Sequence, residues 1–157
     1  MKTTSILFVC IGNICRSPMA EGIFKAILKR EHCEHEFLVD SAGTLGYHAG
    51  ESPDSRMCAH ASRRGYFLQH RSRKITRNDF GNFDLLVVMD DENYDDVSVM
   101  AQTKEEQSKI IRMTDYCTRH KATHIPDPYY GGSAGFEHVI DLLEDACEEL
   151  FKQARAY

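Results

Sequence analysis

Short runs of apolar, β-branched and aromatic residues alternate along this chain with segments of helical periodicity. The first run, Ser5 to Cys10, reads SILFVC, and three others occupy residues 36–41, 84–89 and 109–113. Strands that are apolar on both faces are typical of a parallel sheet buried on both sides. The segment from Phe136 to Ala154 repeats apolar residues every three or four positions, as a helix packed on such a sheet does. The alternation therefore predicts an α/β fold.

The expected architecture is one domain over residues 1–157, with four parallel strands and helices on both faces of the sheet. Further helices are expected at residues 17–30, 54–64 and 90–100, and Gly65 is expected to end the second of them. The segment from Thr114 to Gly135 shows no clear periodicity. Loops of this length in a compact domain are usually functional.

Composition excludes several classes of protein. The net charge of −5 argues against broad nucleic-acid binding, which needs a basic face. No segment approaches the ~20 apolar residues that span a bilayer, and the apolar run near the N-terminus is not followed by a small-residue cleavage site. Six cysteines without an export signal predict reduced thiols. We expect a cytoplasmic monomer that binds neither nucleic acid nor membrane.

The segment from Cys10 to Pro18 (CIGNICRSP) lies where the first strand ends and the first helix begins. Ligands of open α/β sheets bind at such junctions. The segment matches neither the Walker nor the dinucleotide pattern. Gly12 and Asn13 are the residues most able to adopt positive φ, so successive N–H groups are expected to surround an anion. The loop expected to bind phosphate comprises Ile11, Gly12, Asn13, Ile14 and Cys15.

Three side chains at this junction predict nucleophilic chemistry. Arg16 offers a planar guanidinium that suits two phosphate oxygens. Cys10 lies in the positive field of Arg16 and the helix N-terminus, which lowers a thiol pKa below its ordinary value of about 8.5. A thiolate there is placed for in-line attack on phosphorus, and Ser17 is expected to hydrogen-bond Cys10 and ease its departure. The simpler alternative makes Cys10 a buried strand-end thiol and Arg16 a surface residue.

Transfer of a phosphoryl group to Cys10 also requires an acid. A phenol leaves with a pKa near 10, so its protonation lowers the barrier at neutral pH. The long loop supplies Asp115 and Asp127, and Asp127 is the better candidate because Pro128 stiffens the chain beside it. The same carboxylate is expected to activate the water that hydrolyses the phosphocysteine.

Three tyrosines are expected at the substrate rim. Tyr129 and Tyr130 follow the acid directly, and with Tyr47 they are expected to form a slot for a flat ring. Two alternatives stay open. The tyrosines only pack the loop against the body, or one of the adjacent pair is a phosphorylation site.

The sequence CIGNICRSP closely resembles the signature loop of the low-molecular-weight protein tyrosine phosphatases. The segments Asp40 to Gly43, Met89-Asp90 and Asp127 to Tyr130 are similar to later segments of that family. The resemblance implies a flavodoxin-like sheet and tyrosine-phosphorylated protein substrates. It further implies inorganic phosphate or other oxyanions as active-site ligands and no cofactor.

The same resemblance implies roles for individual residues. Cys10 is implied to be the nucleophile that forms a phosphocysteine, Arg16 the phosphate clamp and Asp127 the general acid. Asn13 is implied to shape the loop through a network with Ser41 and His70. Tyr47 falls where the family places a rim aromatic.

A redox role is expected for Cys15. Cys10 and Cys15 lie five residues apart in one tight loop, so inward-pointing sulfurs would come within bonding reach. Peroxide would oxidise Cys10 to a sulfenic acid, and attack by Cys15 would form a protective disulfide. In the alternative, Cys15 only fills a small apolar gap beneath the loop.

Other readings of the sequence are weaker. The spacing of Cys117, His120 and His124 resembles half of a zinc site, but a fourth ligand is missing, so no metal is expected. A thiol-dependent arsenate reductase would relay electrons through cysteines near the third strand, and residues 80–90 contain none. A module that only binds phosphorylated partners needs neither a thiol nor an acid.

Overall fold

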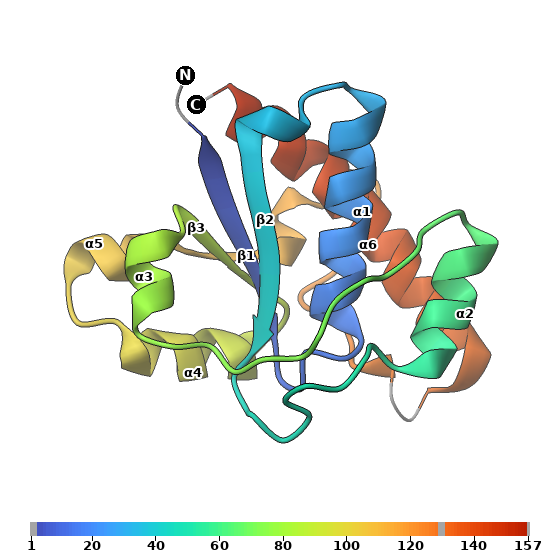
Figure 1. Cartoon of the computed structure of the whole chain (residues 1–157), viewed down its shortest axis with the longest axis horizontal. Helices are drawn as coiled ribbons and strands as arrows, with labels where there is room; N and C mark the ends of the chain where they lie inside the picture. The colour runs from blue at the N-terminus through green and yellow to red at the C-terminus, as the bar shows by residue number, and fades with distance from the viewer. Residues whose placement is uncertain (1–2, 129–130, 157) are drawn as a thin grey trace.

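Four parallel strands form one sheet in the order β2-β1-β3-β4 (Figure 1). They are β1 (Thr4–Cys10), β2 (Phe37–Gly43), β3 (Leu85–Val88) and β4 (Ile110–Arg112). The computed structural model describes residues 3–128 and 131–156. In the register of the sheet Cys10 lies opposite Gly43, and Val9 lies opposite both Ala42 and Val88. The predicted α/β fold with four parallel strands is confirmed.

Helices cover both faces of the sheet, as expected. The bounds are α1 (Arg16–Arg30), α2 (Ser55–Arg63), α3 (Asn78–Asn82), α4 (Asp91–Met100), α5 (Lys104–Ser108) and α6 (Gly132–Arg155), with short 3₁₀ helices η1 (Glu34–Glu36) and η2 (Met113–Tyr116). Figure 1 shows α1 and α6 on one side of the sheet and α3 and α4 on the other. No helix in the described parts of the chain is long and apolar enough to cross a membrane.

The central strand shows why its sequence is continuously apolar. Ile6 and Phe8 belong to the core between the sheet and α1 and α6, whereas Leu7 and Val9 belong to the core on the other face. All four side chains are fully buried. Burying each contributes roughly 1.5–3 kcal/mol, so both layers hold β1 in place. The end of β1 is thereby fixed at the edge where the loops converge.

Sequence and structure differ at the ends and in the short helices. Helix α6 begins at Gly132, four residues before the expected start at Phe136, and η2 occupies part of the expected loop. Helices α3 and α5 were not predicted, because five residues are too few to show a periodicity. Gly65 has φ = +86° and follows the end of α2, as expected.

Candidate active site

The loop between β1 and α1, residues 10–17, is called here the phosphate loop. Asn13 adopts φ = +56°, as predicted. Gly12 does not, so that part of the prediction is wrong. A Cβ at Gly12 would lie 3.1 Å from Cδ2 of His48, so any larger residue at this position would require the His48 ring to shift. The phosphate loop is therefore shaped by one left-handed residue and one close approach.

Cys10 is 2% exposed and lies at the end of β1. Its Sγ is 3.0 Å from Oγ of Ser17 in the first turn of α1. Nδ2 of Asn13 donates to the same Oγ at 2.8 Å, and the Ser17 hydroxyl has both the Cys10 sulfur and, at 3.5 Å, the carbonyl oxygen of Ala42 within reach. The expected contact between Ser17 and Cys10 is present.

The Asn13 side chain makes four hydrogen bonds that fix the phosphate loop. Besides Ser17, its Nδ2 donates to Oγ of Ser41 at 3.0 Å. Its Oδ1 accepts from Nε2 of His70 at 2.7 Å and from the backbone N–H of Arg73 at 3.0 Å. Because a backbone N–H can only donate, the Arg73 contact settles the orientation of the amide. The structure thus brings Ser41 and His70 to Asn13, as the family resemblance implied.

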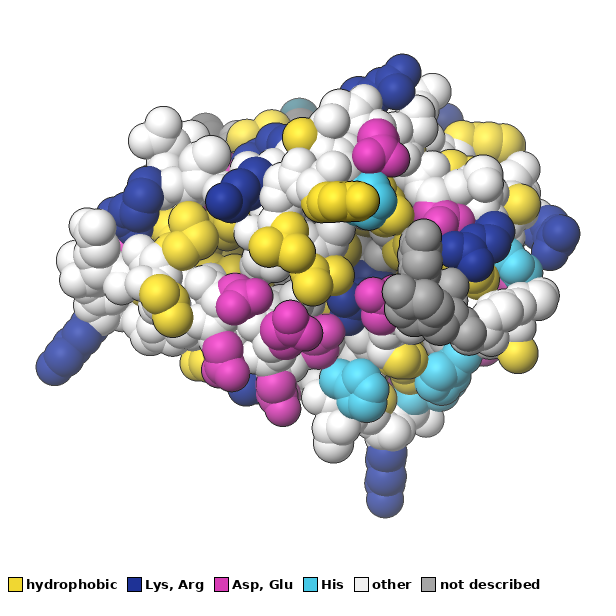
Figure 2. All heavy atoms as spheres, turned by 90° about the horizontal axis from the view of Figure 1, so that it is seen from below, with side chains coloured by type: hydrophobic (Ala, Val, Ile, Leu, Met, Phe, Trp, Pro, Cys, Tyr) yellow, Lys and Arg dark blue, Asp and Glu magenta, His cyan; other side chains and the backbone are white. Residues whose placement is uncertain are grey.

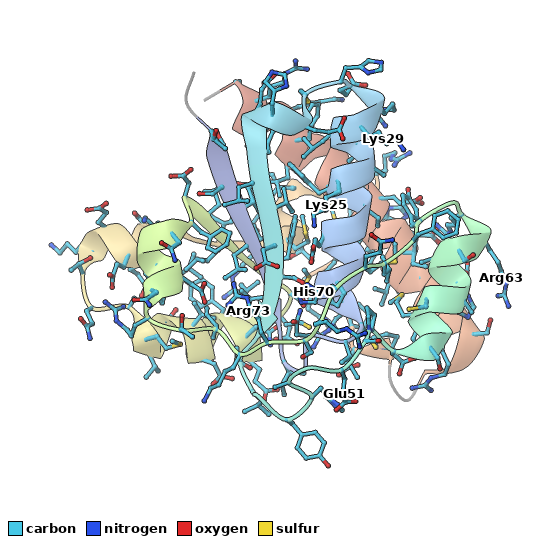
Figure 3. All side chains as sticks on the ribbon, in the orientation of Figure 1. Lys25, Lys29, Glu51, Arg63, His70 and Arg73 are labelled. Carbon is cyan, nitrogen blue, oxygen red and sulfur yellow. The ribbon has the colours of Figure 1, made fainter. Side chains whose placement is uncertain are left out.

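Behind this network, Glu21, Asp40 and His70 place one ligand atom each within 4.8 Å of one another, which is the spacing of a metal site. The two carboxylates of this group already form ion pairs with basic side chains. Nζ of Lys25 lies 2.6 Å from Glu21, and Nη2 of Arg73 lies 3.1 Å from Asp40. Figure 3 shows Lys25 on α1, and His70 and Arg73 on the segment that crosses in front of the sheet. We interpret the group as an ion-pair network that supports the phosphate loop.

Arg16 is 2% exposed and is held by two groups outside the phosphate loop. Its Nη1 donates to Oδ2 of Asp90 at 2.6 Å and to the carbonyl of Ile125 at 2.9 Å. Burial by itself lowers the pKa of Arg16, but the charges of Cys10 and Asp90 outweigh it and the net pKa shift is upward. The guanidinium therefore stays a cation at the floor of the site.

Asp90 is a functional residue that the sequence analysis missed. Its Oδ1 accepts from the backbone N–H of Asn93 and caps α4, while its Oδ2 binds Arg16. Asp90 was expected inside the helix of residues 90–100, whereas it is the N-cap of α4. A signal was available, since an acidic residue directly after the third strand lies at the same sheet edge as Arg16.

Asp127 lies beside Arg16, with its Oδ2 3.8 Å from Nη2. Its side chain is 45% exposed. The preceding residue pair is held in place because the N–H of Ile125 donates to the carbonyl of Met89 at 2.8 Å. Asp115 lies in η2 and is not among the described residues that line the cavity next to Cys10. Of the two candidate acids, the geometry therefore favours Asp127 over Asp115.

A cavity of about 280 Å³ opens at this edge of the sheet. It is lined by Cys10, Ile11, Gly12, Ile14, Cys15, Arg16, Tyr47, His48 and Asp127. Figure 2 looks onto this face from below. Tyr47 stands at the rim with 84% of its surface exposed. Tyr129 and Tyr130, also expected at the rim, lie outside the described residues.

The two cysteines of the cavity differ in their surroundings. Cys15 is 5% exposed, and burial raises its pKa far above the ordinary range for a thiol. It is therefore a neutral thiol beside the hydrogen-bonded Cys10. Among the described residues, Cys117, His120 and His124 do not form a group at metal-ligand spacing. Nδ1 of His120 pairs with Asp145, and Sγ of Cys117 faces the carbonyl of Leu142.

Comparison with known proteins gives one consistent result. The family model described as low molecular weight phosphotyrosine protein phosphatase matches residues 5–156. A putative low molecular weight protein-tyrosine-phosphatase of Synechocystis is 47% identical over 145 residues, 92% of each chain.

Solved structures agree with the family match. A protein tyrosine phosphatase from Entamoeba histolytica with Hepes in its active site is 44% identical, covers 98% of each chain and has a TM-score of 0.95. An arginine phosphatase of Drosophila is 33% identical, covers 98% of this chain and 97% of its own, and has a TM-score of 0.88. Together with the site geometry, these matches show that the chain belongs to the low molecular weight phosphotyrosine protein phosphatases, which are hydrolases.

Proposed function

We propose that this protein hydrolyses phosphotyrosine in proteins through a phosphocysteine formed on Cys10. The observation that carries the proposal is the position of the Cys10 sulfur. It lies 3.0 Å from the Ser17 hydroxyl, in a cavity that Arg16 and Asp127 also line. A nucleophile, an anion-binding cation and a proton donor therefore share one cavity.

The first step transfers the phosphoryl group to the enzyme. The Cys10 thiolate attacks phosphorus, so an S–P bond forms as the bond from phosphorus to the phenolic oxygen breaks. Asp127, protonated, gives its proton to that oxygen, and the product leaves as a neutral phenol. Arg16 and the N-terminus of α1 stabilise the charge on the equatorial oxygens.

The second step regenerates the thiolate. Asp127, now a carboxylate, takes a proton from water, whose oxygen attacks phosphorus. The S–P bond breaks and inorganic phosphate is released. The hydrogen bond from Ser17 stabilises the departing sulfur as its negative charge returns.

The cavity walls support aryl phosphates as substrates. Ile11, Ile14 and Tyr47 add apolar surface to the lining of the cavity that contains Cys10, and such surface suits a flat ring. A phosphoserine side chain has no ring to pack against this surface. A phosphoguanidino group would leave polar N–H groups against the isoleucines, which carries a desolvation cost.

A panel of matched peptides tests this function. Phosphotyrosine peptides should be hydrolysed far faster than phosphoserine, phosphothreonine or phosphoarginine versions of the same sequence. Cys10→Ser serves as the inactive control. Equal rates on phosphotyrosine and phosphoserine peptides, or a preference for phosphoarginine, would refute the proposed substrate.

Two alternative functions are tested in parallel. A binding module would hold phosphotyrosine peptides without releasing phosphate. An arsenate reductase would oxidise thioredoxin in the presence of arsenate. β3 contains no cysteine to serve as a relay, which favours the phosphatase.

We also propose that Cys15 protects Cys10 from irreversible oxidation. Peroxide converts the Cys10 thiolate to a sulfenic acid, and the Cys15 sulfur then forms a disulfide with the release of water. Both residues line the same cavity, which supports the pairing. The negative charge of Cys10 is one of the causes of the raised pKa of Cys15, and oxidation removes that charge.

Recovery after peroxide tests the redox proposal. Cys15→Ser should recover much less activity than wild type when a thiol reductant follows peroxide. Non-reducing mass spectra should show a Cys10–Cys15 peptide in the wild type. Equal recovery in both proteins with no such peptide would exclude the disulfide.

A cytoplasmic location and a monomeric state complete the proposal. Both rest on the sequence. Cell fractionation and analytical ultracentrifugation test them directly.

A further inference from the structure

Ser72 connects the phosphate loop to the rim of the cavity. It is 4% exposed and lies on the segment between α2 and α3. Its Oγ donates to the carbonyl oxygen of Gly12 at 3.0 Å. Its backbone carbonyl accepts from Gly50 at 2.8 Å, and its backbone N–H donates to the carbonyl of Glu51 at 2.9 Å. One residue thus contacts both the phosphate loop and the rim segment, residues 45–52.

The contact with Gly12 determines the direction of a neighbouring N–H group. A trans peptide unit is planar, and its N–H points opposite to its C=O. Because Ser72 holds the Gly12 carbonyl on the outer side of the phosphate loop, the N–H of Asn13 is directed to the opposite side. That N–H belongs to the loop whose amides surround the anion.

Two features of the same peptide unit favour its rotation. Gly12 lacks a Cβ, which lowers the barrier on one side of the peptide. Asn13 has φ = +56°, a conformation that L-residues occupy at a cost. Rotation of the Gly12–Asn13 peptide by about half a turn would bring Asn13 back to negative φ. It would also turn the Gly12 carbonyl toward the anion, where the two negative groups would repel each other.

The rim shares this connection. The guanidinium of Arg71 donates to Oγ of Ser52 at 2.8 Å, next to the two backbone bonds of Ser72. The rim segment carries Tyr47 and His48, and the His48 ring packs against Gly12. A displacement of Ser72 would therefore alter both the anion-binding amides and the rim.

We propose that Ser72 is a positioning residue that keeps the Gly12–Asn13 peptide in the orientation that accepts the phosphate group. The proposal deepens the proposed function because it concerns the phosphate end of the same cavity. Without the hydroxyl, a fraction of molecules holds the rotated peptide. Apparent affinity for every phosphate ligand then falls by that fraction.

The test compares Ser72→Ala with wild type in the full chain, using inorganic phosphate as the probe. Isothermal titration should give a phosphate Kd about three- to ten-fold weaker in the variant, the range expected for one buried hydrogen bond. KM for p-nitrophenyl phosphate should rise by the same factor, and kcat should change less. Ser72→Thr retains the hydroxyl and should restore most of the affinity.

Ser62→Ala is the matched control, because Ser62 is an exposed serine on α2. It should bind phosphate as wild type does. A wild-type phosphate Kd in Ser72→Ala would overturn the proposal, and so would a lower melting temperature with an unchanged Kd. If wild type binds phosphate but does not hydrolyse phosphotyrosine, the proposed function fails while a shifted Kd still supports the role of Ser72.

Discussion

The phosphate loop and the acid loop, residues 117–128, bring their groups to one cavity by different means. In the phosphate loop Cys10, Asn13, Arg16 and Ser17 are each no more than 2% exposed. In the acid loop the side chain of Asp127 is 45% exposed. The first loop is fixed by side-chain hydrogen bonds to its own residues and to neighbouring segments. The second is held at separate points along its length.

Two points of attachment hold the acid loop. Asp145 on α6 is 1% exposed and accepts backbone N–H bonds from Thr118, Arg119 and His120. Ile125 bonds to the carbonyl of Met89 and to Arg16. The difference matches the chemistry, since the phosphoryl group needs fixed donors while the acid must exchange protons with water.

The largest effect on catalysis is expected from a substitution in the phosphate loop. Cys10→Ser should lower kcat for p-nitrophenyl phosphate by roughly 10⁴-fold or more, because an alcohol is a poor nucleophile without a base. Phosphate binding should persist, since the loop amides and Arg16 are unchanged. Steady-state kinetics and titration with phosphate measure the two quantities. Substantial turnover by the variant would show that Cys10 is not the nucleophile.

A smaller loss of activity is expected from a substitution in the acid loop. Asp127→Asn should lower kcat for phenolic substrates by roughly 10²–10⁴-fold, because the leaving group departs without a proton. The loss should shrink for aryl phosphates whose phenols are strong acids. A series of substituted phenyl phosphates measures this dependence. If Asp115→Asn were damaging and Asp127→Asn harmless, the two aspartates would have to exchange roles.

Arg16 of the phosphate loop lies beside Asp127 of the acid loop and is bound by Asp90. Asp90→Asn keeps an oxygen that can cap α4 but removes the charge beside Arg16. We expect the phosphate Kd to weaken by about ten-fold and the free energy of unfolding to fall by about 2–3 kcal/mol. Urea unfolding and phosphate titration provide the values. A variant with wild-type affinity would show that the phosphate loop positions Arg16 without help from Asp90.

The smallest catalytic effect is expected at the far end of the acid loop. Asp145→Asn should change kcat only a few-fold, because Ile125 still holds the chain near Asp127. It should lower the free energy of unfolding by about 2 kcal/mol at pH 7, because the variant accepts fewer hydrogen bonds. Urea unfolding and steady-state kinetics separate the two effects. A hundred-fold loss of kcat would show that the acid loop moves as one rigid unit.

The stability effect of Asp145 should depend on pH in one direction. Burial alone would raise the pKa of Asp145, but hydrogen bonds from Thr118, His120 and Arg119 outweigh it and hold the pKa well below its ordinary value. Because the pKa of Asp145 is lower in the folded than in the unfolded state, its ionised carboxylate stabilises the fold at pH values above the unfolded-state pKa of about 3.9. That stabilisation is lost as the pH falls toward the folded-state pKa. The difference between wild type and Asp145→Asn should therefore shrink below about pH 4. A difference that grew on acidification would contradict this sign.

The contrast between the loops also explains what the sequence could predict. The phosphate loop is contiguous, so the strand, the loop residues and the helix start were all recognisable, and the structure brings Ser17 to Cys10. Asp127 was predicted from its neighbours in the chain, and the structure places it beside Arg16. Asp90 contacts Arg16 across a long sequence separation, and only its position directly after the third strand could have indicated that contact. Ser72 contacts Gly12 across a similar separation, and no local pattern marks it.

The fold could be predicted where an element is long enough for its sequence pattern to show its environment, and not where it is shorter. The apolar runs of β1 and β3 are buried on both faces, so their sequence shows the environment directly. The five-residue helices α3 and α5 are held by contacts such as the bonds from Thr76 to Asp79 and from Glu106 to Thr103. Segments of that length carry capping signals but no periodicity.

The central claim is that phosphate passes through a covalent bond to Cys10. Rapid quench of the wild-type enzyme with ³²P-labelled phosphotyrosine peptide, followed by proteolysis and mass spectrometry, measures this directly. We predict label on the peptide that contains Cys10, at a level that rises in Asp127→Asn if hydrolysis of the phosphocysteine becomes slower than its formation. Absence of label from Cys10 during turnover, with release of phosphate at the full rate, would contradict the account.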